Sequence, residues 1–266
     1  MAFANVAVWP YVLKAQTMQV TFFDVAQGDA IFIETRQGHQ ILIDGGPNNA
    51  VVEKLGQALP FADKSLDLVV LTHPDADHIT GLVGVLEAYD VENVLWTGME
   101  KETNIFASWQ AALRQEGANI WLVADPQVIR WSQSSQERID VLYAADQTAE
   151  VNDTSVVTKL VFGETSFLFP GDITSKIEQE MLQENIDIDA DILKIPHHGS
   201  KYSSSENFLA AVSPQLAVIQ VGKNNTYGHP TPEVLKRLGR IPILRTDQNG
   251  DIIIQSNGNA ITTNHN

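Results

Sequence analysis

The segment at residues 72–78 constrains this chain most, because it places four side chains that commonly bind metal ions within six positions. It reads Thr-His-Pro-Asp-Ala-Asp-His, and the four side chains are His73, Asp75, Asp77 and His78. The apolar run at residues 66–71 predicts a buried strand before it, and apolar residues at helical spacing from Ile79 predict a helix after it. Residues two apart in an extended loop point the same way, so the first two ligands can face one ion while the last two face another. A loop that only caps the helix is the alternative, but capping needs one such residue.

Three later segments add candidate ligands, each after an apolar, strand-like run. Asp172 stands where one carboxylate can bridge two ions, His197 and His198 form an adjacent pair, and His229 follows the last run. Five of the seven histidines lie in these segments or in the first loop. A metal bound by one loop alone would lack the shell that fixes its geometry, so we expect these segments to meet the loop.

The order of the remaining elements predicts an α/β fold with two mixed β-sheets covered by outer helices. Strands are expected at residues 18–25, 30–34, 40–44, 66–71, 156–161, 166–169, 191–195 and 216–220, and around Val94, Ile120, Val128 and Ile139. Helices are expected at residues 51–59, 79–89, 105–116, 175–183, 207–212 and 232–238. The pair Asn249-Gly250 is a strong turn signal and predicts a closing hairpin over residues 242–255.

Composition bounds the setting of this chemistry. With 266 residues and 44% hydrophobic content the chain can bury one large core, so we expect a single domain over residues 18–266. The absence of cysteine excludes disulfides and thiolate ligands, which leaves His, Asp and Glu to bind metal. The formal charge of -16 disfavours non-specific DNA binding, which depends largely on Lys and Arg.

Residues 1–17 are largely apolar but fall short of the roughly 20 residues that a membrane helix needs. They also lack the charged start of an intact signal peptide. We interpret them as the remnant of a membrane anchor or signal segment, with an ordinary edge strand or docking helix as the alternative.

Taken in order, these segments resemble the metallo-β-lactamase superfamily and, within it, the hydrolase domain of ComEC-type DNA-uptake proteins. The first loop corresponds to the superfamily signature His-x-His-x-Asp-His, with Asp75 in place of the second histidine. The resemblance covers nearly the whole chain from Met18 and also runs through residues 22–30, 41–46, 152–155, 171–172, 197–200, 227–230 and 245–247. It implies an αββα sandwich of two mixed β-sheets flanked by helices, the metallo-β-lactamase fold.

The resemblance also implies a dinuclear site for two divalent ions, zinc or manganese. Asp75 makes the site richer in oxygen than a typical zinc β-lactamase, which makes manganese a candidate beside zinc. Where many superfamily members carry a histidine, the region around Asn152 has none, so that role passes to His198 in preference to His197. One ion is expected on His73, Asp75 and His198, the other on Asp77, His78 and His229, with Asp172 between them. Catalytic roles are assigned to Asp77, Asp172 and His197.

The expected reaction is phosphodiester hydrolysis. Coordination lowers the pKa of bound water from about 15.7 toward about 7, so a metal-bound hydroxide is the expected nucleophile. The leading hypothesis is a ComEC-like DNA nuclease, extracytoplasmic or membrane-associated by resemblance, with a membrane channel or anchor as a partner. A hydrolase of small phosphodiesters such as choline-phosphate esters and a metal-binding module without turnover are the alternatives, and β-lactam hydrolysis ranks lower. The expected substrate contacts are Asn152, Asp153, Ser155, Ser200, Lys201 and Tyr227.

Two further carboxylates lie near these motifs. Asp44 is expected to orient a ligating histidine rather than to bind metal itself. Asp29 is expected either to reach the site or to order the first hairpin.

Overall fold

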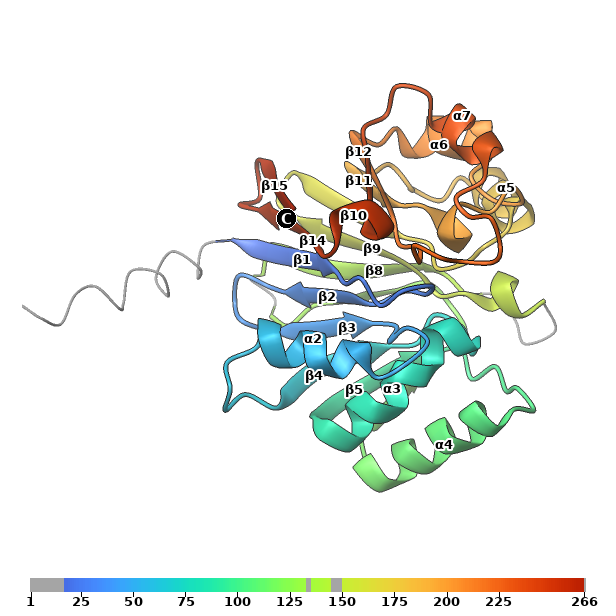
Figure 1. Cartoon of the computed structure of the whole chain (residues 1–266). Coiled ribbons are helices and arrows are strands. Elements are labelled where there is room, and N and C mark those ends of the chain that lie inside the picture. Colours follow the sequence, from blue (N-terminus) through green and yellow to red (C-terminus); the bar gives the residue numbers. More distant parts are fainter. Residues whose placement is uncertain (1–16, 133–134, 145–149, 266) are drawn as a thin grey trace, which may run out of the picture.

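The computed structural model of the chain describes residues 17–132, 135–144 and 150–265 (Figure 1). The expected anchor or signal remnant at residues 1–17 lies outside these ranges, apart from Thr17. Within the described part of the chain, no helix has the length and apolar character needed to cross a membrane.

Two mixed β-sheets form the centre of the fold. The strands of the second follow one another in sequence order, whereas in the first the late strands β14 and β15 lie beside β1. Among the described residues, the first sheet has eight strands in the spatial order β15 (Ile261–His265), β14 (Ile252–Ser256), β1 (Met18–Phe22), β2 (Ile31–Glu34), β3 (Gln40–Ile43), β4 (Ser65–Val70), β5 (Asp90–Trp96) and β6 (Asn119–Leu122). The second sheet has seven described strands in the order β13 (Ile243–Arg245), β12 (Leu216–Ile219), β11 (Ile192–Lys194), β10 (Thr165–Phe169), β9 (Val157–Phe162), β8 (Glu137–Tyr143) and β7 (Gln127–Ile129).

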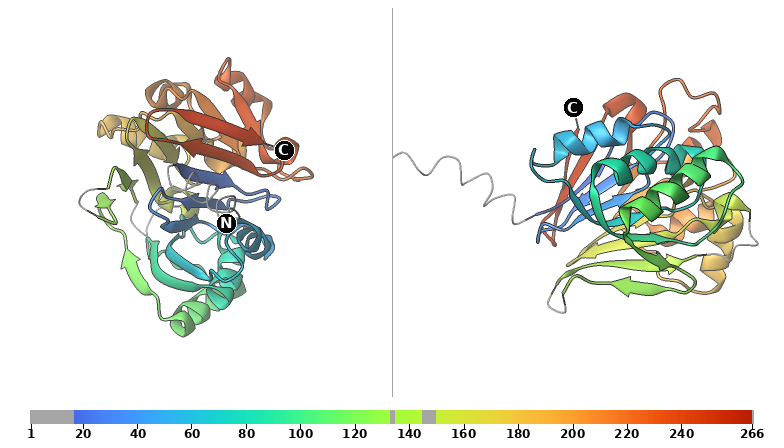
Figure 2. Two further views of the ribbon diagram at one scale, coloured as in Figure 1. Left: turned by 90° about the vertical axis from the view of Figure 1, so that its left-hand side faces the viewer. Right: turned by 90° about the horizontal axis from the view of Figure 1, so that it is seen from below.

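Helices cover the outer face of each sheet. The first sheet is covered by α2 (Ala50–Ala58), α3 (Ala76–Ala88) and α4 (Asn104–Glu116), the layer that faces the viewer in the right panel of Figure 2. The second sheet is covered by α5 (Ser175–Gln183), α6 (Glu206–Val212) and α7 (Pro232–Leu238). These three helices lie at the upper right of Figure 1, whereas α2, α3 and α4 lie in its lower half. Three short turns complete the described elements: η1 (Val151–Thr154), η2 (Pro196–Gly199) and α8 (Thr246–Asn249).

Three apolar clusters hold these four layers together. One joins the first sheet to its helices and includes Trp109 of α4, which is fully buried. The second lies between the sheets and includes Phe22 of β1 and Phe169 of β10, whose ring centroids are 6.1 Å apart. The third joins the second sheet to its helices and includes Phe208 of α6. The expected αββα sandwich is confirmed.

The predicted closing hairpin at residues 242–255 is wrong. Its two strands belong to different sheets, because β13 pairs in parallel with β12 while β14 pairs antiparallel with β1. The pair Asn249-Gly250 does end a turn, but a helical one. The Oδ1 atom of Asn249 accepts a hydrogen bond from the Arg245 amide, and Gly250 follows α8 at a φ of 65°. The hairpin partner of β14 is β15.

Parallel strands bring the expected ligands to one edge of both sheets. In the first sheet, β3 and β4 are parallel, and Asp44 and His73 lie just beyond their carboxyl ends. In the second, β10 and β11 are parallel, and Asp172 and His198 follow their carboxyl ends. Because parallel strands end at the same edge of a sheet, segments far apart in sequence meet there.

Candidate metal centre

The first motif spans the end of a loop and the start of a helix, which differs from the expected loop. The helix α3 begins at Ala76 with Asp75 as its N-cap, so Asp77 and His78 lie in its first turn. The backbone amides of His78 and Ile79 donate to the carbonyl of Asp75, which fixes this turn. The extended part before it behaves as expected, since Nε2 of His73 lies 3.9 Å from Oδ2 of Asp75.

Three buried histidines have their Nδ1 atoms held by the protein. Nδ1 of His78 lies 2.8 Å from Oδ2 of Asp44, and Nδ1 of His198 lies 2.9 Å from the carbonyl oxygen of Gln220. Nδ1 of His73 lies 3.0 Å from Oγ1 of Thr72, and that hydroxyl donates in turn to Asp44. An acceptor at Nδ1 favours the tautomer whose lone pair is on Nε2, so all three rings present a ligand atom.

The three Nε2 atoms are buried and have no hydrogen-bond partner among the described residues. Carboxylate oxygens lie near two of them at distances typical of neighbouring ligands. Oδ2 of Asp172 is 3.4 Å from Nε2 of both His78 and His198, and Oδ2 of Asp77 is 3.3 Å from Nε2 of His198. Buried polar atoms are rarely left without partners, so this convergence fits a cation among them. We call the group formed by Asp77, His78, Asp172 and His198 the inner position.

A second group lies beside the first. His73, His78 and Asp172 each bring one ligand atom within 4.8 Å of the others, and the ring centroids of His73 and His78 are 4.1 Å apart. We call the group formed by His73, Asp75 and Asp172 the outer position. This grouping differs from the expected one, because His198 joins Asp77 and His78 rather than His73 and Asp75. The physical reason is the carbonyl of Gln220, which holds the His198 ring on the second sheet's side of the centre.

His229 and His197 lie next to each other rather than in either position. Their ring centroids are 5.7 Å apart, and neither belongs to a group of three converging ligand atoms among the described residues. The ring of Tyr227 stacks on His229 at 5.8 Å with 23° between the planes, and 69% of Tyr227 is exposed. Nδ1 of His229 is buried without a hydrogen-bond partner among the described atoms, so that histidine keeps a free ligand atom.

The expected substrate contacts divide into exposed and buried side chains. Lys201 and Tyr227 are exposed, and the amide of Asn152 lies 3.4 Å from the His197 ring nitrogens. The other three are buried, namely Asp153, Ser155 and Ser200.

The buried three hold the wall of the site together. Asp153 accepts from the Thr174 hydroxyl at 2.6 Å, and Oγ of Ser155 accepts from the Asp172 amide at 3.1 Å. The Ser200 amide donates to the carbonyl of His197. Substrate contact by these three stays a prediction that their burial does not support.

Two further charged residues lie at the centre. The sequence assigned no role to Lys194, whereas Asp29 was expected either to reach the site or to order the first hairpin. Lys194 is fully buried, and its Nζ atom contacts Asp29 and lies 3.3 Å from Oδ1 of Asp172. Asp29 is also buried, with Oδ1 3.3 Å from Nδ1 of His198. The sequence does contain a signal for Lys194, because it lies in the apolar strand β11, where an unpaired charge would be costly.

Electrostatics at the inner position favour cation binding. Burial alone would lower the pKa of His198, but the carboxylates of Asp172 and Asp29 outweigh it and raise the pKa to about 10. Burial opposes protonation of His78 in the same way, and Asp172 and Asp44 hold its pKa well above the usual range. The outer histidine behaves differently, because burial and the charge of His78 lower the pKa of His73 to about 4. The negative potential is therefore concentrated at the inner position.

We expect metal binding to release protons and to strengthen as the pH rises. With a pKa of about 10, His198 of metal-stripped protein carries a proton at pH 6 to 8, and so does His78. A cation must displace those protons, so affinity should rise about tenfold per pH unit for each proton displaced. Calorimetric titration with Mn²⁺ at pH 8 in buffers of different ionisation enthalpy measures the release directly. Binding without proton release would contradict the inner position.

The fold and the centre together define a class of protein, an αββα sandwich with a His and Asp cluster at the strand ends of both sheets. A sequence profile of the metallo-beta-lactamase superfamily matches residues 23–223. The chain belongs to the metallo-β-lactamase superfamily, whose members are generally metal-dependent hydrolases.

Among individual proteins, the chain is similar to proteins of bacterial competence. The ComE operon protein 3 of Bacillus subtilis is 35% identical, over 88% of this chain and 32% of its own length. Competence protein ComA of Neisseria gonorrhoeae is 29% identical, over 91% of this chain and 33% of its own length. The chain thus spans about a third of the length of these curated relatives.

Solved structures agree on the fold. The metallo-beta-lactamase fold protein YhfI from Bacillus subtilis matches 86% of this chain and 95% of its own with a TM-score of 0.51, at 12% identity. A long form RNase Z from yeast matches 90% of this chain and 42% of its own with a TM-score of 0.54, at 11% identity.

Proposed function

We propose that this chain is a dinuclear metal-dependent phosphodiesterase and acts as a DNA nuclease of the ComEC-like type. The observation that carries the proposal is the set of three buried Nε2 atoms, on His73, His78 and His198, that converge with carboxylates and have no hydrogen-bond partner among the described residues. Because the chain belongs to a superfamily of metal-dependent hydrolases, metal-dependent hydrolysis is the chemistry that this arrangement supports best.

The ligand sets suit zinc or manganese. One ion would be held at the inner position by Asp77, His78, Asp172 and His198, and the other at the outer position by His73, Asp75 and Asp172. Imidazole with carboxylate fits either metal. When bound, the two ions would supply an activated water molecule and stabilise the attacking and leaving oxygens of an in-line displacement.

The protein's own contribution is to fix the ligands and to shape the wall. Asp44 and Gln220 hold the rings of His78 and His198 in one orientation, so these ligand atoms need no reordering when a substrate arrives. Among the expected substrate contacts, the exposed Lys201 would offer an ammonium to a phosphate oxygen, and the exposed Tyr227 would offer an aromatic face to a base.

The names of the relatives point to DNA as the substrate. They include a competence protein and Recombination protein 2 of Haemophilus influenzae, which is 28% identical. The net charge of -16 means that little affinity for DNA can come from the general surface. A membrane channel or anchor that delivers the strand would compensate, and the longer relatives have room for one.

A second candidate is hydrolysis of small phosphodiesters such as choline-phosphate esters. The exposed Tyr227 ring beside His229 favours it, because aromatic faces attract quaternary ammonium groups. An acidic surface is no obstacle to such a substrate.

We expect metal-stripped protein to cleave single-stranded DNA and bis-p-nitrophenyl phosphate only after manganese or zinc is restored. The double variant Asp77→Ala His78→Ala should lose this cleavage, since it removes two donors of the inner position. A matched control is Asp67→Ala His39→Ala, another His and Asp pair, 2.9 Å apart and outside the centre, which should keep its activity.

Three outcomes separate the hypotheses. Metal-dependent DNA cleavage that disappears only in the first variant supports the nuclease. Cleavage of the ester without DNA cleavage supports the small-phosphodiester hydrolase. Metal binding without turnover of either substrate would leave a metal-binding module.

A further inference from the structure

Asp75, an expected ligand of the outer position, is paired with a lysine from another segment. Nζ of Lys101 donates to Oδ1 of Asp75 at 2.5 Å. Its other oxygen, Oδ2, is the one that lies 3.9 Å from Nε2 of His73. A positive charge therefore already sits on the carboxylate that would complete the outer position.

The two metal positions are unequal for this reason. The inner position has four ligand residues, each within 3.3–3.4 Å of another, and no described lysine is paired with Asp77. Lys194 lies 3.3 Å from Asp172, but that carboxylate is common to both positions and does not distinguish them. In contrast, no group of three converging ligand atoms among the described residues includes Asp75. The outer position depends on a carboxylate that is shared with an ammonium.

Lys101 differs from Lys194, the other lysine at the centre. Lys194 is fully buried among Asp29, Asp172 and the carbonyl of Gly171, so it is a fixed part of the fold. The side chain of Lys101 is 35% exposed, and Asp75 is 27% exposed. A pair with that much access to water is held weakly and can exchange.

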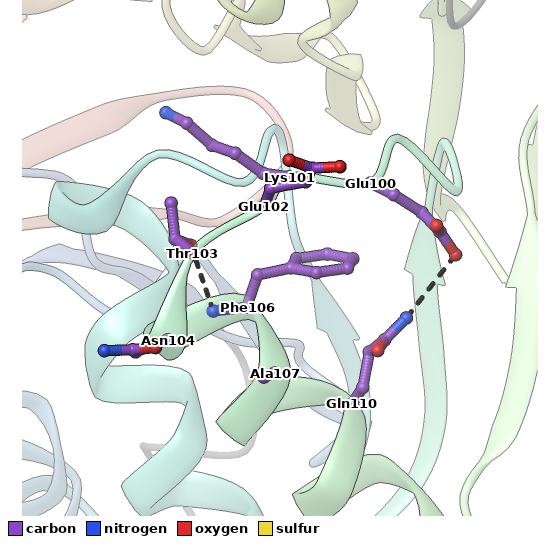
Figure 3. Close-up of a pocket in the computed structure, with 8 residues that line it drawn as sticks. All are labelled: Glu100, Lys101, Glu102, Thr103, Asn104, Phe106, Ala107 and Gln110. Atoms are coloured by element: carbon purple, nitrogen blue, oxygen red, sulfur yellow. Dashed lines mark hydrogen bonds between the residues drawn. The ribbon is translucent and has the colours of Figure 1, made fainter.

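The segment that carries Lys101 is open to solvent, so the ammonium can leave Asp75 without entering a closed space. It links β5 to α4 and lines an open pocket of about 350 Å³. Figure 3 shows the Lys101 side chain extending away from the hydrogen bond between Glu100 and Gln110, with the carboxylate of Glu102 on the same segment. An ammonium displaced from Asp75 meets solvent, because the Lys101 side chain is already 35% exposed.

We infer that Lys101 competes with the second metal ion for Asp75, so that the chain binds one ion tightly and the other in exchange with this ammonium. The inference rests on the proposed metal centre. Occupancy of the outer position, and with it the dinuclear state, is then set by metal concentration rather than fixed.

The test counts ions instead of measuring turnover. Metal-stripped protein is titrated with Mn²⁺ by equilibrium dialysis and calorimetry, and the wild type should show one tight and one weaker site. Lys101→Met should tighten the second site by about tenfold, the lower end of the effect of groups that contact metal ligands, and should leave the first unchanged. Lys101→Arg keeps the charge and should keep the competition.

The matched control is Lys54→Met. Lys54 pairs with Asp251 at 2.8 Å with side chains 26% and 25% exposed, which resembles the Lys101 pair in all but location. It should change neither site. A second site that stays the same or weakens in Lys101→Met would overturn the inference, because Lys101 would then be indifferent or would orient Asp75 for the metal. Two-step binding with this response, but without hydrolysis of any phosphodiester, would refute the proposed function and leave the competition standing.

Discussion

Asp172→Asn is expected to reduce metal-dependent phosphodiester hydrolysis by about a thousandfold, the largest loss from a single substitution in this protein. Oδ2 of Asp172 is 3.4 Å from the free nitrogens of both His78 and His198, and Asp172 also converges with His73. It is thus the one carboxylate common to the inner and outer positions. An amide keeps the shape but not the charge, so both positions lose an anionic ligand.

Metal content and activity are measured together for this variant. Restored Asp172→Asn protein should retain less than one tightly bound ion, while circular dichroism shows a native fold. Asp187→Asn is the matched control, because the Asp187 side chain is 80% exposed and its ion pair with Lys159 lies outside the metal centre. If Asp172→Asn kept two ions and activity within about tenfold of wild type, Asp172 would not be shared and the proposed centre would be wrong.

Local patterns were sufficient for most of the secondary structure. The bounds of α5 and α7 coincide with those expected from apolar spacing, and α6 begins one residue earlier than expected. In these helices the buried residues fall at the expected spacing, such as Ile177 and Met181 of α5. The helical period of the apolar residues and a single buried face determine such a helix, so its position can be predicted from the local sequence.

Pairing between distant strands could not be read in the same way. Asn249-Gly250 forms a turn as expected, yet the strands on either side of it pair with β12 and β1 in separate sheets. Turn chemistry is a property of a few residues, whereas the choice of sheet depends on which edges remain open. The expected helix at residues 79–89 began three residues too late, because its start was placed at the first apolar residue. The first turn of α3 contains the polar residues Asp77 and His78 instead.

The candidate site was predicted as a list of residues but not as a set of groups. The motifs that contain His73, Asp172 and His198 reach the same edge of the sandwich, because each follows a parallel strand. What spacing could not show is that a carbonyl from β12's end holds His198 beside Asp77, or that Lys101 reaches Asp75 from 26 positions away. Lys194 received no role from the sequence, because its partner Asp29 lies far away in the chain, before β2.

Lys194→Met is expected to lower the free energy of unfolding of metal-stripped protein by about 3–5 kcal/mol, the usual cost of removing one partner of a buried ion pair. Burial would by itself lower the pKa of Lys194, but the carboxylates of Asp29 and Asp172 outweigh it and raise the pKa, so the lysine is charged. Methionine fills much the same space but removes the ammonium that neutralises part of the charge of these two buried carboxylates. Urea unfolding followed by circular dichroism measures the change.

Lys159→Met separates the loss of charge from the loss of a long side chain. Lys159 lies on β9 of the same sheet and is largely buried, but its partner Asp187 is exposed and can be solvated once the lysine is gone. This control should therefore cost no more than about 1 kcal/mol. The double variant Lys194→Met Asp29→Asn should recover at least half of the stability lost in Lys194→Met, because it removes one of the uncompensated charges. If the double variant were as unstable as the single one, the loss would come from packing around β11, and Lys194 would not be the counter-ion of Asp29 and Asp172.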